Sequence, residues 1–221
     1  MKKCAVCGVV CKGENVIKKE DIFGVGNGAE LYHNLWHFDL EFCENCNYVS
    51  KDISGCKNLK VNDMRVEFLD PILIEMQTAR PNAIEEYLRA GAYYLSISDN
   101  MTSALCYLQA GDLVYKELFY WNENLLDYGN ELLKIKSNDI KKDFTIYAEK
   151  IFDKGLKLLE SELSTLKDLT YTLLYVGFLL TLGKDIDKAK YLIKKYDSLM
   201  LDANDRQILN YIKSNFNYKL K

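Results

Sequence analysis

The sequence has little proline, little glycine and no excess of positive charge. Its 221 residues include two prolines and twelve glycines, which leave little room for long flexible linkers. The formal net charge is −3, so the chain lacks the basic field by which many proteins hold nucleic acid or an anionic membrane. With 48% hydrophobic and 28% charged residues, the chain is globular in composition and long enough for one sizeable domain or two modest ones.

Long hydrophobic runs are missing too. The longest uncharged stretch, residues 169–183, has fifteen residues, fewer than the roughly 18 apolar residues that a membrane-spanning helix needs. We therefore expect this stretch to form a helix that is buried on most sides. Two lysines follow Met1, and no apolar run comes after them, so we predict that the chain has no secretory signal. We therefore expect a cytoplasmic location.

Seven cysteines are present, and four of them form two Cys-x-x-Cys pairs. An odd number of cysteines without a secretory signal fits metal binding under reducing conditions better than a disulfide framework. A Cys-x-x-Cys turn directs two sulfurs at one point, and zinc prefers four soft ligands at tetrahedral corners. We predict one structural zinc site whose ligands are Cys4, Cys7, Cys43 and Cys46.

The two pairs are followed by matching residues. Gly8 follows the first pair, where the turn needs a residue at positive φ with its amide directed at a sulfur, and Asn47 holds the same place after the second pair. Residues 8–42 read as short strands joined by turns, which predicts a small β zinc ribbon with a long insertion. The glycine-rich residues 24–28 lack the lysine of a phosphate-binding loop, so we interpret them as a hairpin tip.

The remaining metal-binding side chains do not form an obvious second site. His33 and His37 lie in a segment with strand-like alternation, which would place them on one face roughly 13 Å apart, too far to share one ion. Cys11 and Cys56 read as small hydrophobic residues or auxiliary thiols near the zinc, and Cys106 lies in an apolar helical pattern. A second metal bound by these cysteines and histidines stays an open alternative.

A helix-start signature separates the cysteine-rich part from the rest. Asp70 as N-cap and Pro71 at the first helical position predict a domain boundary near residue 70. We therefore predict a zinc-ribbon-like domain over residues 1–69 and a helical domain over residues 70–221. Helices are expected at about 82–96, from 102 onward, 123–136, 139–164 after Asn138 and Asp139, 168–182, 185–199 and 203–217.

Two helical pairs fit the spacing of small and large residues in tetratricopeptide repeats. The matching residues are Tyr87, Ala90, Gly91, Tyr94, Ala104 and Leu108 in the first pair, and Leu173, Val176, Gly177, Leu180, Ala189 and Ile193 in the second. Small residues let two helices approach closely, and large ones fill the space between successive pairs. The predicted fold is mainly α, with tetratricopeptide-like antiparallel helical hairpins after a small N-terminal β zinc ribbon.

Taken together, these features resemble a bacterial family of unknown function catalogued as DUF2225. The resemblance is carried by the Cys-x-x-Cys-Gly start, by the long insertion, by the aromatic-rich segment around the second pair and by the helical repeat tail. Cys43, Cys46 and Tyr48 match the second cysteine motif of the family, whereas Glu44 and Asn47 replace its proline and glycine. The resemblance implies the zinc ligands and implies no activity.

Four cysteine ligands would close the coordination sphere of the zinc, whereas a catalytic zinc keeps one position open for water. No nucleophile, base and orienting group can be named together elsewhere, so we predict that the protein is not an enzyme. The function that we predict is a protein-interaction or scaffold module whose helical groove binds an unidentified protein or peptide. The tyrosines expected to line this groove are Tyr93, Tyr94, Tyr107 and Tyr171.

Two alternatives remain. The ribbon could bind single-stranded nucleic acid through lysines and through stacking on Trp36 or Tyr48, although residues 1–70 contain nine basic and eleven acidic residues. The lysines concerned are Lys2, Lys3, Lys12, Lys18 and Lys19. The ribbon could instead be a thiol/zinc redox sensor, in which oxidation of the cysteines releases the zinc and unfolds residues around it.

Overall fold

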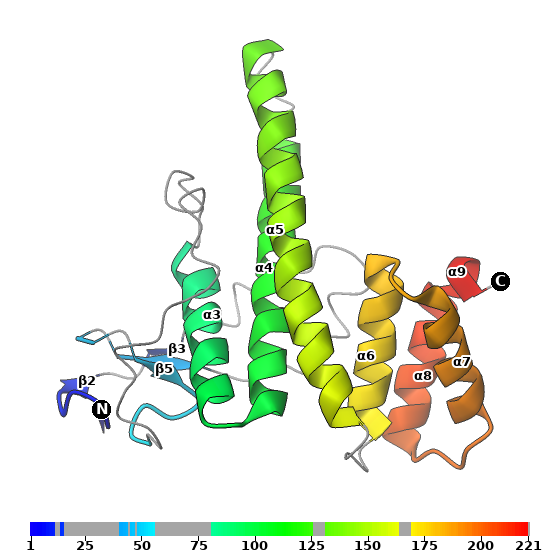
Figure 1. Ribbon diagram of the computed structural model, residues 1–221, viewed down its shortest axis with the longest axis horizontal. Coiled ribbons are helices and arrows are strands. Elements are labelled where there is room, and N and C mark those ends of the chain that lie inside the picture. Colours follow the sequence, from blue (N-terminus) through cyan, green and yellow to red (C-terminus); the bar gives the residue numbers. More distant parts are fainter. Residues whose placement is uncertain are drawn as a thin grey trace. The chain divides into compact units, whose positions relative to one another are not determined.

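The computed structural model describes residues 1–11, 14–15, 40–43, 45–46, 48–55, 81–125, 131–163 and 169–220. These residues are mostly helical, and their few short strands lie in the N-terminal part (Figure 1), as the mainly α prediction required. The helices are α3 (Pro81–Ser96), α4 (Asn100–Leu125), α5 (Glu131–Leu163), α6 (Leu169–Leu182), α7 (Ile186–Asp197), α8 (Ala203–Asn215) and α9 (Asn217–Leu220). The predicted helix start at Asp70 and Pro71 lies outside the described residues.

Five strands form two small antiparallel sheets. The strands are β1 (Lys2–Lys3), β2 (Val10–Cys11), β3 (Glu14–Asn15), β4 (Glu41–Phe42) and β5 (Val49–Ser50). β1 pairs with β2, and the second sheet has the order β3-β4-β5, with Phe42 opposite Val49. Each strand has two residues, and ladders of that length are too short to be stable on their own. Other contacts must therefore hold this part of the chain together.

The described residues fall into two compact units. The first contains the strands, α3, α4 and α5 as far as Leu158, and the second runs from Leu159 through the remaining helices. The predicted boundary near residue 70 lies outside the described residues, so the division into residues 1–69 and 70–221 stays a prediction.

In the first unit, α3 and α4 form a helical hairpin that packs closely around a glycine. A Cβ atom on Gly91 would lie 3.1 Å from the ring of Tyr107, so the ring occupies the space that a larger residue would need. The buried hydroxyl of Ser103 donates to the Gly91 carbonyl oxygen at 2.7 Å. In the turn between α3 and α4, the Asp99 carboxylate accepts a hydrogen bond from the Thr102 N–H at 3.1 Å. This N-cap contact begins α4.

Helix α5 corrects two of the predicted boundaries. It is continuous over 33 residues, so the predicted break at Asn138 and Asp139 is wrong; of the helix predicted at 123–136, residues 123–125 belong to α4 and residues 131–136 to α5. Asn and Asp each cost only up to about 0.7 kcal/mol in a helix interior, which is too little to end a helix of good helix formers. In the first unit, α5 approaches α4 at Gly155, where a Cβ atom would lie 2.9 Å from Leu108.

The second unit is built around α6. All nine residues from Thr172 to Leu180 are buried, as expected for the longest uncharged stretch, and α6 packs against α7 and α8 (Figure 1). The helix ends at Gly183, which has a φ of 67°, and the Lys184 N–H donates to the Leu179 carbonyl oxygen at 2.9 Å. In the described part of the chain, no helix is both long and apolar enough to cross a membrane.

The residues chosen by the repeat pattern are buried in both helical pairs. They are Tyr87, Ala90, Gly91, Tyr94, Ala104 and Leu108 in α3 and α4, and Leu173, Val176, Gly177, Leu180, Ala189 and Ile193 in α6 and α7. Helices α4 and α5 depart from the pattern, because they have 26 and 33 residues, whereas a whole two-helix repeat has about 34.

Candidate metal centre

The structure brings the two Cys-x-x-Cys pairs together. One ligand atom from each of Cys4, Cys7, Cys43 and Cys46 lies within 4.8 Å of every other, and we call these four residues the cysteine cluster. Within the described residues, this is the only group of three or more cysteine, histidine or acidic side chains close enough to hold a metal ion. The four residues predicted as zinc ligands therefore could hold one ion.

The sulfur positions fit a tetrahedral site. A zinc–sulfur bond of about 2.3 Å implies an edge of about 3.8 Å between sulfurs at tetrahedral corners. The Cys4 and Cys46 sulfurs are 3.7 Å apart, and the Cys7 and Cys43 sulfurs are 3.6 Å apart. These distances are far longer than a disulfide bond, and all four cysteines are free thiols. A set of four sulfurs at this spacing suits a soft, tetrahedral metal ion.

The first knuckle, residues Cys4 to Val9, is closed by backbone hydrogen bonds. The Cys4 N–H donates to the Val9 carbonyl oxygen at 2.9 Å, and the Gly8 N–H donates to the Cys4 carbonyl oxygen at 2.9 Å. Gly8 has the expected positive φ, 75°. The expectation that its amide would point at a sulfur is wrong, because the amide of the next residue, Val9, donates to the Cys7 sulfur instead.

The second knuckle, Cys43, Asn45, Cys46 and Tyr48, repeats this pattern. The Cys43 N–H donates to the carbonyl oxygen five residues later, on Tyr48, at 2.9 Å, and the Tyr48 N–H donates to the Cys46 sulfur. In both knuckles, the amide two residues after the second cysteine thus donates to its sulfur. Amide donors of this kind orient metal-binding thiolates and stabilise their negative charge. Asn47 lies outside the described residues.

The cluster places thiols in unequal environments. The Val9 N–H, helped by the side chain of Asn45, lowers the pKa of the partly exposed Cys7 thiol to about 6. Burial raises the pKa of Cys4 and of Cys46, against the backbone amides that donate to their sulfurs. Metals bind the thiolate, so a cation at the centre would favour ionisation at the buried positions as well.

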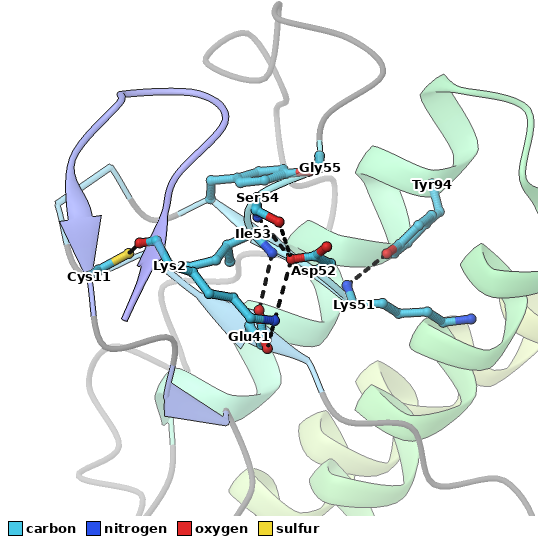
Figure 2. A network of polar contacts seen from close by, with 10 residues as sticks. Lys2, Cys11, Glu41, Lys51, Asp52, Ile53, Ser54, Gly55 and Tyr94 are labelled. Carbon is cyan, nitrogen blue, oxygen red and sulfur yellow. Dashed lines mark hydrogen bonds and ion pairs between the residues drawn. The ribbon is translucent and has the colours of Figure 1, made fainter.

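An ionic network beside the cluster ties β1 to β4 (Figure 2). The Lys2 ammonium lies 2.6 Å from the Glu41 carboxylate and 3.4 Å from the Asp52 carboxylate. The hydrogen bond from Lys2 to Glu41 raises the pKa of Lys2, and the Ser54 hydroxyl lowers the pKa of Asp52. Lys2 and Asp52 are therefore both charged at neutral pH.

The loop after β5 closes the other side of the first knuckle. The Ala5 N–H donates to the Ile53 carbonyl oxygen at 2.8 Å, and the Ile53 N–H donates to Glu41 at 3.2 Å. The Ile53 side chain is buried. Residues from three separate parts of the sequence, around 5, 41 and 53, thus meet beside the cluster, as Figure 2 shows for Glu41 and Ile53.

The structure also decides several other expectations. Cys11 is buried, lies outside the cluster, and its thiol points at the Lys2 carbonyl oxygen at 3.7 Å. Cys106 is buried in the core of the helices, as predicted, and burial raises the pKa of its thiol. Cys56, His33 and His37, the other side chains of the alternative second metal site, lie outside the described residues.

The predicted tyrosine groove is wrong in its residues. Tyr93, Tyr94 and Tyr107 are buried, so they pack the helices instead of lining an open surface, and only Tyr171 of the four is partly exposed. Tyr48, proposed as a stacking platform for nucleic acid, is only 1% exposed. Its ring packs against Tyr93, with centroids 5.4 Å apart in an edge-to-face arrangement.

Sequence reasoning missed the contacts that attach the second knuckle to the helices. The Lys51 N–H donates to the Tyr94 hydroxyl at 2.8 Å, and the Tyr48 hydroxyl donates to the Gly55 carbonyl oxygen at 2.7 Å. An aromatic residue two positions after a Cys-x-x-Cys pair was the one available signal, because such a residue must pack somewhere close to the cysteine cluster.

Comparison with known proteins adds no relative: no protein-family model matches the sequence, and neither do curated proteins or solved structures. The functional argument therefore depends on the site itself. Four thiols around one point can hold an ion and so hold together the two short chain segments that carry them, residues 4–7 and 43–46.

Proposed function

We propose that the protein binds one structural zinc ion at the cysteine cluster and works as a protein-interaction or scaffold module. The observation that carries the zinc proposal is the convergence of four sulfurs at tetrahedral spacing on two knuckles with the same backbone hydrogen bonds. Zinc is the ion that most commonly occupies four-cysteine sites in which the protein supplies every ligand. Cys4, Cys7, Cys43 and Cys46 would hold it.

A site of this composition would be structural. Four thiolates fill the coordination sphere and leave no position for a water or a substrate, so we propose a protein without catalytic activity. The short strands support a structural role, because ladders of two residues need another source of stability. A zinc ribbon is the fold that we propose for this N-terminal part.

For the helices, we propose a tetratricopeptide-like arrangement of hairpins, supported by the burial of the small and large residues that the pattern selects. The same combination of cysteine pairs and helical hairpins is why we also propose a relationship to DUF2225.

A partner would need a surface other than the buried tyrosines. The described residues of the second unit offer an exposed one on α7 and the turn after it, where Tyr191, Leu199 and Met200 lie open to solvent.

Of the two alternatives, the redox sensor has the better support. Cys7 and Cys46 are partly exposed, so an oxidant can reach a sulfur of the cluster. Nucleic-acid binding is less well supported, since Lys2 is paired with Glu41 and Asp52 and Tyr48 is buried.

Metal analysis tests the zinc proposal. We expect the full-length, reduced protein to contain about one zinc per chain, because four ligands define one site. Cys43→Ser and Cys7→Ser should each lower the zinc content strongly and disorder the strands, whereas Cys106→Ser, a matched change at a buried cysteine outside the cluster, should leave it unchanged. Unchanged zinc content in both cluster variants would show that the site is wrong.

A further inference from the structure

Tyr48 belongs to the metal centre and to a helix interface at the same time. Its carbonyl oxygen accepts the Cys43 N–H at 2.9 Å, and its own N–H donates to the Cys46 sulfur. Its ring, in contrast, is buried against Tyr93 of α3. One residue thus joins the backbone of Cys43 and the sulfur of Cys46 to the surface of a helix.

The residues after Tyr48 extend this interface. We call residues 48–55 the docking segment, because they contact α3 and the start of α4. The Lys51 N–H donates to the Tyr94 hydroxyl, and the Lys51 ammonium lies 3.2 Å from the Thr102 hydroxyl (Figure 2 draws Lys51 and Tyr94). Burial raises the pKa of Tyr94 to about 12, so this hydroxyl stays neutral at physiological pH.

The docking segment has little regular structure of its own. Its only strand, β5, has two residues and pairs with the equally short β4. A metal site of this kind rarely exists in a chain without the metal, because the strands are short and the exposed Lys2 ion pairs join the two knuckles only weakly. Loss of the ion would therefore release the turn that positions both backbone groups of Tyr48.

We propose that metal binding at the cysteine cluster controls whether the docking segment is packed on α3, with Tyr48 as the residue that transmits the effect. This inference rests on the proposed metal site and adds a regulatory role to it. Loss of the metal uncovers the ring of Tyr93 and removes the hydrogen-bond donor from the hydroxyl of Tyr94. The surface of the first helical hairpin thus differs between the metal-bound and the metal-free protein.

Hydrogen exchange followed by mass spectrometry tests this inference on the full-length chain. Peptides covering residues 87–96 of α3 are compared in protein with zinc and in protein treated with a zinc chelator, and the metal content of both samples is measured. We expect amide exchange in α3 to become at least about tenfold faster when the metal is removed, because local opening tracks the loss of buried contacts. Peptides from α6, in the second unit, serve as an internal control and should not change.

Two variants separate transmission from general destabilisation. Tyr48→Ala removes the ring but keeps the backbone groups that serve the cluster, so the variant should still bind zinc while α3 exchanges quickly with or without it. Tyr48→Phe keeps the ring and is the matched control, in which the dependence on metal should persist. Should Tyr48→Ala fail to fold, Tyr94→Phe removes the acceptor of the Lys51 N–H, and the effect of metal on α3 should shrink by about threefold.

The possible results distinguish this inference from the proposed function. If chelation removes zinc and exchange in α3 does not change, the transmission through Tyr48 is overturned and the zinc site stands. If Tyr48→Ala keeps the metal-dependent protection of α3, the docking is real but Tyr48 does not transmit it, which also overturns the inference. If the purified protein contains no transition metal, the proposed function fails first and this inference fails with it.

Discussion

The strand region and the second helical unit are held together by different means. In the strand region, the described residues from 1 to 55, five strands of two residues are joined by single hydrogen bonds, the Lys2 ion pairs and the cysteine cluster. In the second unit, nine consecutive residues of α6 are buried against α7 and α8. On the proposed function, an ion takes the place of a large hydrophobic core in the first region, whereas the second region has such a core.

The magnitudes support this contrast. Burying one Leu side chain contributes about 1.5–3 kcal/mol, so the buried leucines of α6 make a large contribution to the stability of the second unit. A structural zinc ion can contribute about 10–16 kcal/mol to the folding of a small domain, as much as several buried leucines. A region with few buried apolar side chains can therefore fold when it binds one ion. It would lose that stability when the ion leaves.

The largest effect that tests this comparison is expected from a core substitution in the second unit. Leu173 is fully buried in α6, so we expect Leu173→Ala to lower the free energy of unfolding by about 2–5 kcal/mol. Denaturant unfolding followed by circular dichroism measures the loss, and zinc analysis should show an unchanged metal content.

The matched control is Leu199→Ala, because Leu199 is an exposed leucine in the turn after α7. Its effect should stay within about 0.5 kcal/mol. A marked fall in zinc content in Leu173→Ala would show that the two regions do not derive their stability separately.

The sequence predicts those features that depend on neighbours along the chain. The knuckles were predictable because each Cys-x-x-Cys pair is local in sequence. The preference of zinc for four ligands then predicts that the two pairs lie together. Most helix bounds were predictable from periodicity, as for α6, which begins one residue after the predicted start and ends at Leu182 as predicted. The merger of the predicted helices into α5 was not, because Asn and Asp weigh only weakly against a helix.

Contacts between distant segments were beyond prediction. The Lys2–Glu41 ion pair joins residues 39 apart, and the Lys51–Tyr94 hydrogen bond joins residues 43 apart. Nothing in either local sequence specifies its partner. The same reason explains the error over Tyr93 and Tyr107, since helical periodicity shows that a tyrosine shares a face with apolar residues and does not show what covers that face.

A smaller effect sharpens the comparison at two glycines that both have a positive φ. Gly8 has a φ of 75° in the first knuckle, and Gly183 has a φ of 67° at the end of α6. In both places a Cβ atom would meet only a flexible lysine side chain, at 3.8 and 3.9 Å, so the cost of alanine is conformational, about 1–2 kcal/mol. We expect Gly183→Ala to lower the stability of the second unit by that amount, without any effect on metal.

Gly8→Ala should instead weaken zinc binding. The cost of alanine at a positive φ then opposes the turn that presents Cys4 and Cys7. A cost of about 1.4 kcal/mol corresponds to a tenfold lower affinity, measured by competition with a chelator of known affinity. Equal losses of affinity in Gly8→Ala and Gly183→Ala would contradict the separation of the two regions.

The smallest expected effect is the pH dependence of a contact in the second unit. The hydrogen bond from Lys188 lowers the pKa of Glu160, and the Tyr175 hydroxyl also donates to this carboxylate, at 3.1 Å. Because the folded pKa lies below the unfolded value of about 4.3, the contribution is present above that pH and is lost as the pH falls through the folded pKa. Glu160 is half exposed, so its pair with Lys188 is worth at most about 1 kcal/mol.

Exchange of α6 amides at pH 7 and pH 3 measures this contribution separately from the zinc, which acid releases by protonating its ligands. Glu160→Gln should exchange faster than the natural protein at pH 7, and the difference should become smaller as the pH falls through the folded pKa of Glu160. Lys188→Met should lose the same contribution at pH 7, because it removes the other partner of the pair. A difference that is equally large at pH 7 and pH 3, together with no effect of Lys188→Met, would mean that Glu160 contributes to stability through packing and not through its charge.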